Sequence, residues 1–78
     1  MIKELDCVAL TADLPDHGLA VSDVGAVVHI YEGGRSYQVE FTTFDGRTVA
    51  VAKVAANQIR PLGSQEIHHA RAFEPAVR

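Results

Sequence analysis

The sequence predicts an all-β domain in which five short strands curl into a small, partly open barrel. Its main signals are apolar residues that alternate with polar ones, glycines that suit tight hairpins, and β-branched residues gathered in short runs. The chain has 78 residues, of which 47% are hydrophobic. A chain of this length buries roughly 60 to 65% of the surface that it exposes when unfolded, so we expect a single core. A curled sheet lets so few strands share that core.

The most regular strand is expected over residues 36–42, where Tyr37, Val39 and Phe41 alternate with polar side chains. This alternation is typical of a strand with one buried face. The strand leads into Asp45-Gly46, and an Asp-Gly pair between two β-prone runs favours a type I′ hairpin turn, in which both central residues have positive φ. We therefore expect a hairpin at this point.

The return strand of that hairpin is expected over residues 48–54. Val49 and Val51 are predicted to face the core, while Lys53 lies either on an edge or after a bulge. A preceding strand is expected over residues 25–31, and the glycines that follow it supply a second hairpin turn. Because this strand is apolar on both faces, its second face needs cover, either from barrel closure or from a partner subunit.

Two shorter strands complete the sheet. One is expected over residues 7–10, and the other is a brief closing strand over residues 58–60 that stops at Pro61. Residues 55–57 suit a single helical turn before this last strand. Residues 13–24 then form a long loop between the first two strands.

A change of composition divides the chain into a folded domain, residues 1–62, and a C-terminal tail, residues 63–78. The first part carries the whole formal net charge of −3 and five of the six glycines. In the tail, Ser64 suits the cap of a short helix with Ile67 and Phe73 on one side. Such a short helix is marginal alone in water, so the alternatives are a disordered tail and a tail docked on a partner or a neighbouring subunit.

The cysteine content and the hydropathy of the chain limit the cellular environments that suit the protein. Cys7 is the only cysteine, so no intramolecular disulfide and no zinc site of several thiolates can form, which suits a reducing cytoplasm. We expect Cys7 to be a small buried hydrophobe. We also expect no signal peptide, and no apolar run approaches the ~20 residues that a membrane span needs.

The histidines are the main candidates for metal or proton chemistry. His17 beside Asp16 suits either metal binding or an ordinary solvated turn, and His29 suits either a pH sensor or cross-strand packing. His68 and His69 are adjacent, so they do not have the spacing that chelates zinc from one face of a helix. We see no nucleophile-base pair, carboxylate pair or phosphate loop, and a core this small rarely encloses a catalytic pocket of about 300 to 1,000 Å³. We therefore expect no enzyme, no metal and no cofactor.

Aromatic and basic residues near the hairpins are the candidates for partner binding. Tyr31 and Tyr37 flank one turn and are expected to stack across it, while Arg35 and Arg47 lie at the two hairpin tips. A nucleic-acid partner needs clustered basic residues, and the acidity of residues 1–62 argues against one. The candidate partner-binding residues, including two in the tail, are Tyr31, Arg35, Tyr37, Arg47, Ile67 and Phe73.

A series of short motifs gives the chain a family resemblance. The motifs are Leu5-Asp6, Leu10, Asp13-Leu14-Pro15, Gly18-Leu19, Asp23-Val24-Gly25, Val27-Val28, Tyr37-Val39-Glu40-Phe41, Asp45-Gly46 and Ile59-Arg60-Pro61-Leu62. Over residues 1–62 the chain resembles a bacterial family of tiny SH3-like barrel proteins of unknown function. The resemblance implies an SH3-like barrel and no catalytic residue. A Gly-Asp-x-Gly-x-Val turn is shared more widely among SH3-like barrels, and here Val21 or Ser22 stands in place of its first glycine.

These observations together favour a non-catalytic role. We expect a small cytoplasmic protein-interaction module that self-associates, because a thin core makes association a source of stability. The alternative is a nucleic-acid-associated accessory protein or an antitoxin-like regulator. The second alternative comes from the resemblance, since members of that family can lie beside genes that look like toxins.

Overall fold

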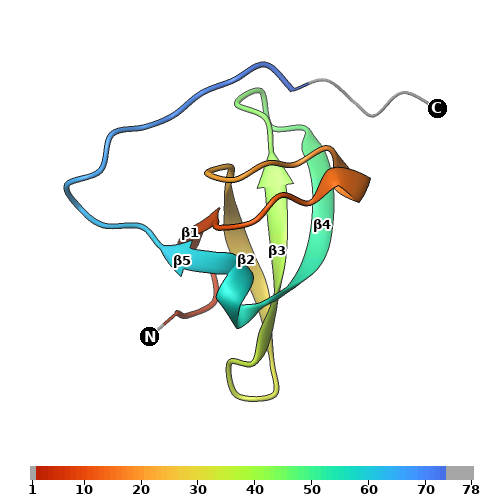
Figure 1. Cartoon of the computed structure of the whole chain (residues 1–78), viewed down its shortest axis with the longest axis vertical. Helices are drawn as coiled ribbons and strands as arrows, with labels where there is room; N and C mark the ends of the chain where they lie inside the picture. The colour runs from red at the N-terminus through yellow and green to blue at the C-terminus, as the bar shows by residue number, and fades with distance from the viewer. Residues whose placement is uncertain (1, 74–78) are drawn as a thin grey trace.

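Five antiparallel strands form one sheet in the order β4-β3-β2-β1-β5 in the computed structural model, which describes residues 2–73 (Figure 1). The strands are β1 Cys7–Leu10, β2 Val24–Tyr31, β3 Ser36–Thr42, β4 Thr48–Ala55 and β5 Ile59–Pro61. Two one-turn 3-10 helices, η1 Pro15–His17 and η2 Ala56–Gln58, connect them. The sheet is not closed, and β4 and β5 are its edges. The prediction of an all-β, five-stranded fold is confirmed.

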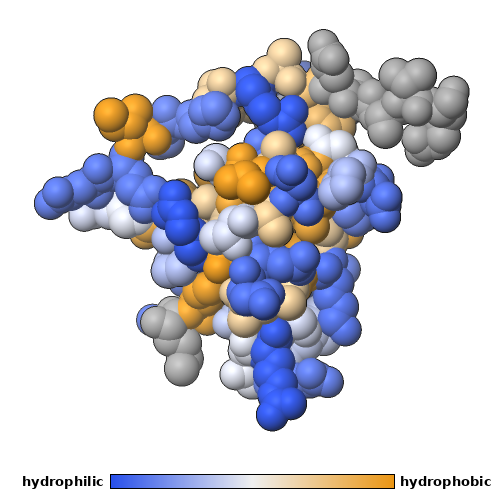
Figure 2. All heavy atoms as spheres, viewed as in Figure 1, coloured by the Kyte–Doolittle hydropathy of each residue, from blue (hydrophilic) through white to orange (hydrophobic). Residues whose placement is uncertain are grey.

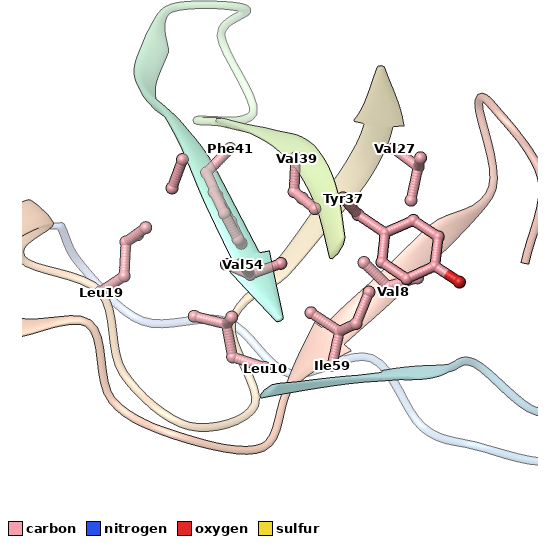
Figure 3. Packing of buried hydrophobic residues seen from close by; sticks show 10 residues of the cluster. Val8, Leu10, Leu19, Val27, Tyr37, Val39, Phe41, Val54 and Ile59 are labelled. Atoms are coloured by element: carbon pink, nitrogen blue, oxygen red, sulfur yellow. The ribbon is translucent and has the colours of Figure 1, made fainter. Parts of the chain in front are cut away.

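The core lies on one face of the curled sheet and draws on every strand (Figure 3). In β3, the predicted alternation is confirmed, because Tyr37, Val39 and Phe41 are all buried. The largest fully buried side chains, Val8, Leu10, Val27, Val39 and Val54, are all aliphatic. No core residue comes from the tail as far as Phe73. The sheet therefore builds its core without the tail.

A bulge in β4 overturns the predicted orientation of Val51. The β3–β4 register shifts between Phe41 and Thr42, which leaves Val49 as an extra residue in β4. Val49 still packs against the core, but after it the side-chain alternation is reversed. Ala52 is consequently buried, whereas Val51 is 45% exposed on the outer face.

The type I′ turn predicted at Asp45-Gly46 does not form there. Gly46 has a φ of 90°, but Asp45 is not in the positive-φ region. The Gly46 N–H donates to the Thr43 carbonyl and the Thr43 N–H donates to the Arg47 carbonyl, both at 2.9 Å. A three-residue loop with glycine in the left-handed position therefore makes this hairpin.

The primed turn lies instead in the β2–β3 hairpin. Glu32 and Gly33 have φ values of 50° and 68°, and the Gly34 N–H donates to the Tyr31 carbonyl at 2.9 Å. Glu32 thus occupies a position that glycine or asparagine prefers.

The tail leaves β5, loops away from the sheet and returns over the β3–β4 hairpin (Figure 1). Residues 63–73 form neither helix nor strand, so the short-helix alternative is wrong for this part of the tail. Its beginning is held by Glu66, which accepts hydrogen bonds from the Gly63 N–H and from Arg60. Among residues 2–73, no helix is long and apolar enough to cross a membrane. Residues 74–78 of the predicted tail lie outside the described residues.

Candidate functional site

A pocket of about 460 Å³ lies between the returning tail and the end of the sheet beside the β3–β4 hairpin. Its body side is mostly apolar and includes Leu19, Val24, Phe41, Phe44 and Val49. The tail side is formed by His69, Ala70, Arg71 and Phe73. The tail therefore supplies the wall that a core this small does not provide by itself.

The tight turn that enters β2 sets one rim of this pocket. Ser22 has a φ of 78°, and the Asp23 N–H donates to the Ala20 carbonyl at 3.0 Å. The Asp23 side chain folds back so that its Oδ2 accepts the Ala20 N–H at 2.9 Å. Ser22, and not Val21, therefore takes the place of the first glycine in the Gly-Asp-x-Gly-x-Val pattern. Asp23 is held by its own turn.

Gly25 follows this turn where β2 passes unusually close to β3. A Cβ on Gly25 would lie 2.6 Å from Val39 Cγ1, 2.8 Å from the Glu40 carbonyl oxygen and 2.9 Å from Phe41 Cδ1. Real Cβ atoms essentially never approach other atoms so closely. Packing therefore requires glycine at the second glycine position of the pattern. This close packing fixes the start of β2, which directly follows Asp23.

Arg71 of the tail binds Asp23 at the rim of the pocket. Arg71 Nε lies 2.8 Å from Asp23 Oδ1, and Arg71 Nη2 lies 2.5 Å from Asp23 Oδ2. The same Nη2 donates to the Gly18 carbonyl at 3.1 Å. The guanidinium therefore makes the two-pronged contact for which its planar shape is suited and adds a third acceptor.

The protonation equilibria of the pair follow from this geometry. Partial burial acts to raise the pKa of Asp23, but hydrogen bonds from Arg71 and from the Ala20 N–H outweigh it and hold the pKa of the carboxyl below its ordinary value. The positive charge of Arg71 acts in the same direction. The hydrogen bond to Asp23 raises the pKa of Arg71. Both partners are consequently ionised at neutral pH.

A second cluster occupies the outer face of the sheet at the opposite hairpin. The His29 and Tyr31 rings meet edge to face with centroids 4.5 Å apart, and Lys53 Nζ lies 4.6 Å from the Tyr31 ring centroid. The Tyr31 hydroxyl hydrogen-bonds Gln38 Oε1 at 3.0 Å. His29 thus packs against an aromatic ring of its own strand and lies across from Gln38.

The structure separates most of the predicted partner-binding residues. Tyr37 is buried in the core opposite Ile30, whereas Tyr31 pairs with Ser36 and lies on the outer face, so the expected stacking of the two tyrosines is wrong. Arg35 and Arg47 are both exposed, but they lie at opposite ends of β3. They do not form one basic patch.

The two predicted tail residues also differ in their surroundings. Ile67 is 95% exposed, whereas Phe73 is half-buried and lines the pocket. Sequence reasoning missed Asp23 and Arg71 as a pair, because 48 residues separate them. The one available signal was the acidic residue of the Gly-Asp-x-Gly-x-Val pattern.

The remaining candidates for chemistry are spread over the surface. Asp16 and His17 are exposed in η1, and Cys7 is exposed at the pocket edge, so its predicted burial is wrong. Within residues 2–73, no three histidine, cysteine or acidic side chains gather as a metal site would require.

The comparisons with known proteins place the chain in a family. Searches of curated proteins and of solved structures found no match. A family model described as a domain of unknown function, DUF4926, matches residues 4–61 and thus covers all five strands and most of the chain. The chain belongs to the DUF4926 family.

Proposed function

We propose that this protein is a non-catalytic, self-associating protein-interaction module that binds an extended protein segment at the pocket beside the β3–β4 hairpin. The observation that carries the proposal is that a segment of the chain itself, within residues 69–73 and neither helix nor strand, already lies against this pocket. We further propose that the module is a bacterial SH3-like barrel, and the strand order β4-β3-β2-β1-β5 supports the SH3-like part of this proposal. One exposed free thiol, that of Cys7, suits a reducing cytoplasm.

The surface around the pocket supports a protein partner. Phe44 is 96% exposed and Val24 is 43% exposed, and both line the pocket. Hydrophobic atoms are also visible at the surface between the tail and the sheet (Figure 2). Apolar side chains gathered around a pocket, with charged groups at its rim, are typical of protein recognition surfaces.

The charge distribution favours a protein over a nucleic acid. Phosphate backbones need several basic side chains on one surface, whereas Arg35 and Arg47 lie at opposite ends of β3. The pocket contributes the carboxylates of Asp23 and Glu40 on its body side. These acids would repel phosphate groups.

Sedimentation equilibrium of the full chain over a wide concentration range tests the proposal. We expect the mean mass to rise above the 8.4 kDa of one chain as the concentration increases. Phe44→Ser is expected to shift this rise to higher concentration. Val51→Ser serves as the matched control, because Val51 is also exposed but does not line the pocket.

Two results would contradict the proposal. One is a mass that stays at 8.4 kDa at every concentration. The other is an equal effect of the two substitutions, which would mean that the pocket surface has no special part in association.

A further inference from the structure

We propose that Asp23 and the Gly18 carbonyl form a recognition site for an arginine side chain on an extended partner segment, and that residues 69–73 are a built-in competitor for this site. The inference rests on the proposed protein-binding function and deepens it. It names the chemistry of the partner, which is an arginine followed two positions later by an aromatic residue.

The acceptors are in position independently of the tail. Asp23 Oδ2 already accepts the Ala20 N–H at 2.9 Å. Gly18, with a φ of 71°, ends η1 and donates its N–H to the Pro15 carbonyl at 3.1 Å. Both contacts lie within the body of the protein. An incoming guanidinium therefore meets acceptors that are already ordered in the folded protein. Binding then loses little conformational entropy at these acceptors, which favours it.

The acceptor geometry selects arginine over lysine. The three acceptor atoms are Asp23 Oδ1, Asp23 Oδ2 and the Gly18 carbonyl oxygen, and Arg71 reaches them from Nε and Nη2. Two nitrogens held in one plane make this possible, whereas a lysine carries one nitrogen at the end of a flexible stem. Lysine therefore loses at least one prong of the contact with the carboxylate.

The spacing of the tail residues sets the second element of the partner. Arg71 and Phe73 both line the pocket, whereas Ala72 between them does not. Phe73 is half-buried, while Ala72 between them is exposed. A partner with an arginine and an aromatic residue at this spacing can use both the acidic rim and the apolar pocket.

The tail is held loosely enough to be displaced. Residues 69–72 are exposed, and the core contains no side chain from the tail as far as Phe73. Releasing the tail therefore leaves the sheet and its core intact. A partner segment has to outcompete the arginine contact and the pocket contacts of His69, Ala70 and the half-buried Phe73.

A peptide with the sequence of residues 64–73, labelled at its N-terminus, is the probe for this site. Its binding is measured by fluorescence anisotropy on the full chain and on full-chain Arg71→Gln, whose tail has lost the guanidinium. We expect Arg71→Gln to bind the peptide at least about threefold more tightly than the unmodified chain, because its site is free for a larger fraction of the time. A peptide with lysine in place of the arginine is expected to bind Arg71→Gln at least about tenfold more weakly, since it loses part of the two-pronged contact.

The double variant Asp23→Asn, Arg71→Gln is the control for the site. Asparagine keeps an oxygen that can accept the Ala20 N–H, so the turn is preserved while the charge is removed. We expect at least about tenfold weaker peptide binding than to Arg71→Gln alone. Circular dichroism melts of both variants verify that each is folded. Should Asp23→Asn unfold the chain, Asp23→Glu, which keeps the charge and moves it, is used instead with the same expected loss.

Equal peptide affinity in the unmodified chain and Arg71→Gln would overturn the competitor role. Equal affinity for the arginine and lysine peptides, or binding that survives the loss of Asp23, would overturn the arginine site. These failures differ from a failure of the proposed function. A chain that self-associates through the Phe44 surface but ignores the peptide contradicts this inference alone, whereas a strictly monomeric chain contradicts the proposed function.

Discussion

Replacing Gly25 with alanine tests the close packing of β2 against β3 beside the pocket. Glycine normally costs stability relative to alanine, because it loses more backbone freedom on folding. Alanine at most permitted positions therefore stabilises a protein by about 0.4 to 1 kcal/mol. At Gly25 the structure predicts the opposite sign.

The magnitude follows from the three close approaches. The new methyl carbon would lie 2.6 Å from Val39 Cγ1, whereas carbon atoms in contact prefer about 3.5 to 4.0 Å. It would also lie 2.8 Å from the Glu40 carbonyl oxygen, which is backbone of β3 and cannot rotate away. Overpacking of this kind costs about 1 to 3 kcal/mol. Since backbone must move here, we take the upper end, and after the gain in backbone entropy a net loss of about 2 kcal/mol remains.

Urea unfolding followed by circular dichroism measures this loss. A single core in a chain this short rarely supplies more than about 3 to 5 kcal/mol. With a slope of about 1 kcal/mol per molar urea, the midpoint for Gly25→Ala is expected about 2 M below that of the unmodified chain. Gly63→Ala is the matched control, because its Cβ meets only the flexible side chain of Glu66, and it should change stability by less than about 0.5 kcal/mol. Equal midpoints for Gly25→Ala and the unmodified chain would refute the packing argument.

Three further outcomes are expected. Ser22→Gly raises the thermal midpoint, because relief of about 1 to 2 kcal/mol of left-handed strain exceeds the added backbone entropy cost of glycine; a lower midpoint would contradict the strain at Ser22. Glu32→Asn stabilises the β2–β3 hairpin for the related reason that asparagine tolerates positive φ, and a urea midpoint unchanged or lowered would argue against it. Docking of the tail holds the pKa of Asp23 below its ordinary value. The ion pair therefore stabilises the docked tail at pH values above the ordinary pKa of Asp23, and this stabilisation is lost as the pH falls through the lowered pKa. Arg71→Gln should therefore raise the pKa of Asp23 measured by carbon NMR, and an unchanged value would mean that no ion pair forms.

The fold was predictable where side-chain alternation is regular. Residues 36–42 form β3 as expected, since their pattern has a period of two and one face is buried. The orientation of Val51 was not predictable, because Lys53 indicated a bulge only as one of two alternatives and nothing in the local sequence marks Val49 as the extra residue. The position of the type I′ turn was not predictable either, because Glu32 adopts a left-handed conformation that glutamate seldom takes.

The candidate site was less accessible to sequence reasoning than the fold. It depends on a contact between Asp23 in the turn before β2 and Arg71 in the tail, and neither residue carries a local pattern that points to the other. Phe73 was identified from its spacing with Ile67 on a helix that does not form. In the structure Phe73 instead lines the pocket together with Arg71, two residues before it. A long-range ion pair of this kind becomes visible only once the chain has folded.

The most direct test of the self-occupied site is a comparison of amide NMR spectra of the unmodified chain and Arg71→Gln. If the tail occupies the site, removing the guanidinium shifts the amide signals of Gly18 and of residues 22–25, which lie in the body of the protein far along the sequence. The signals of Gly33 and Gly34, in the hairpin at the opposite end of β3, stay in place and serve as the internal reference. Shifts confined to residues near position 71, with those of Gly18 and Asp23 unchanged, would contradict the account.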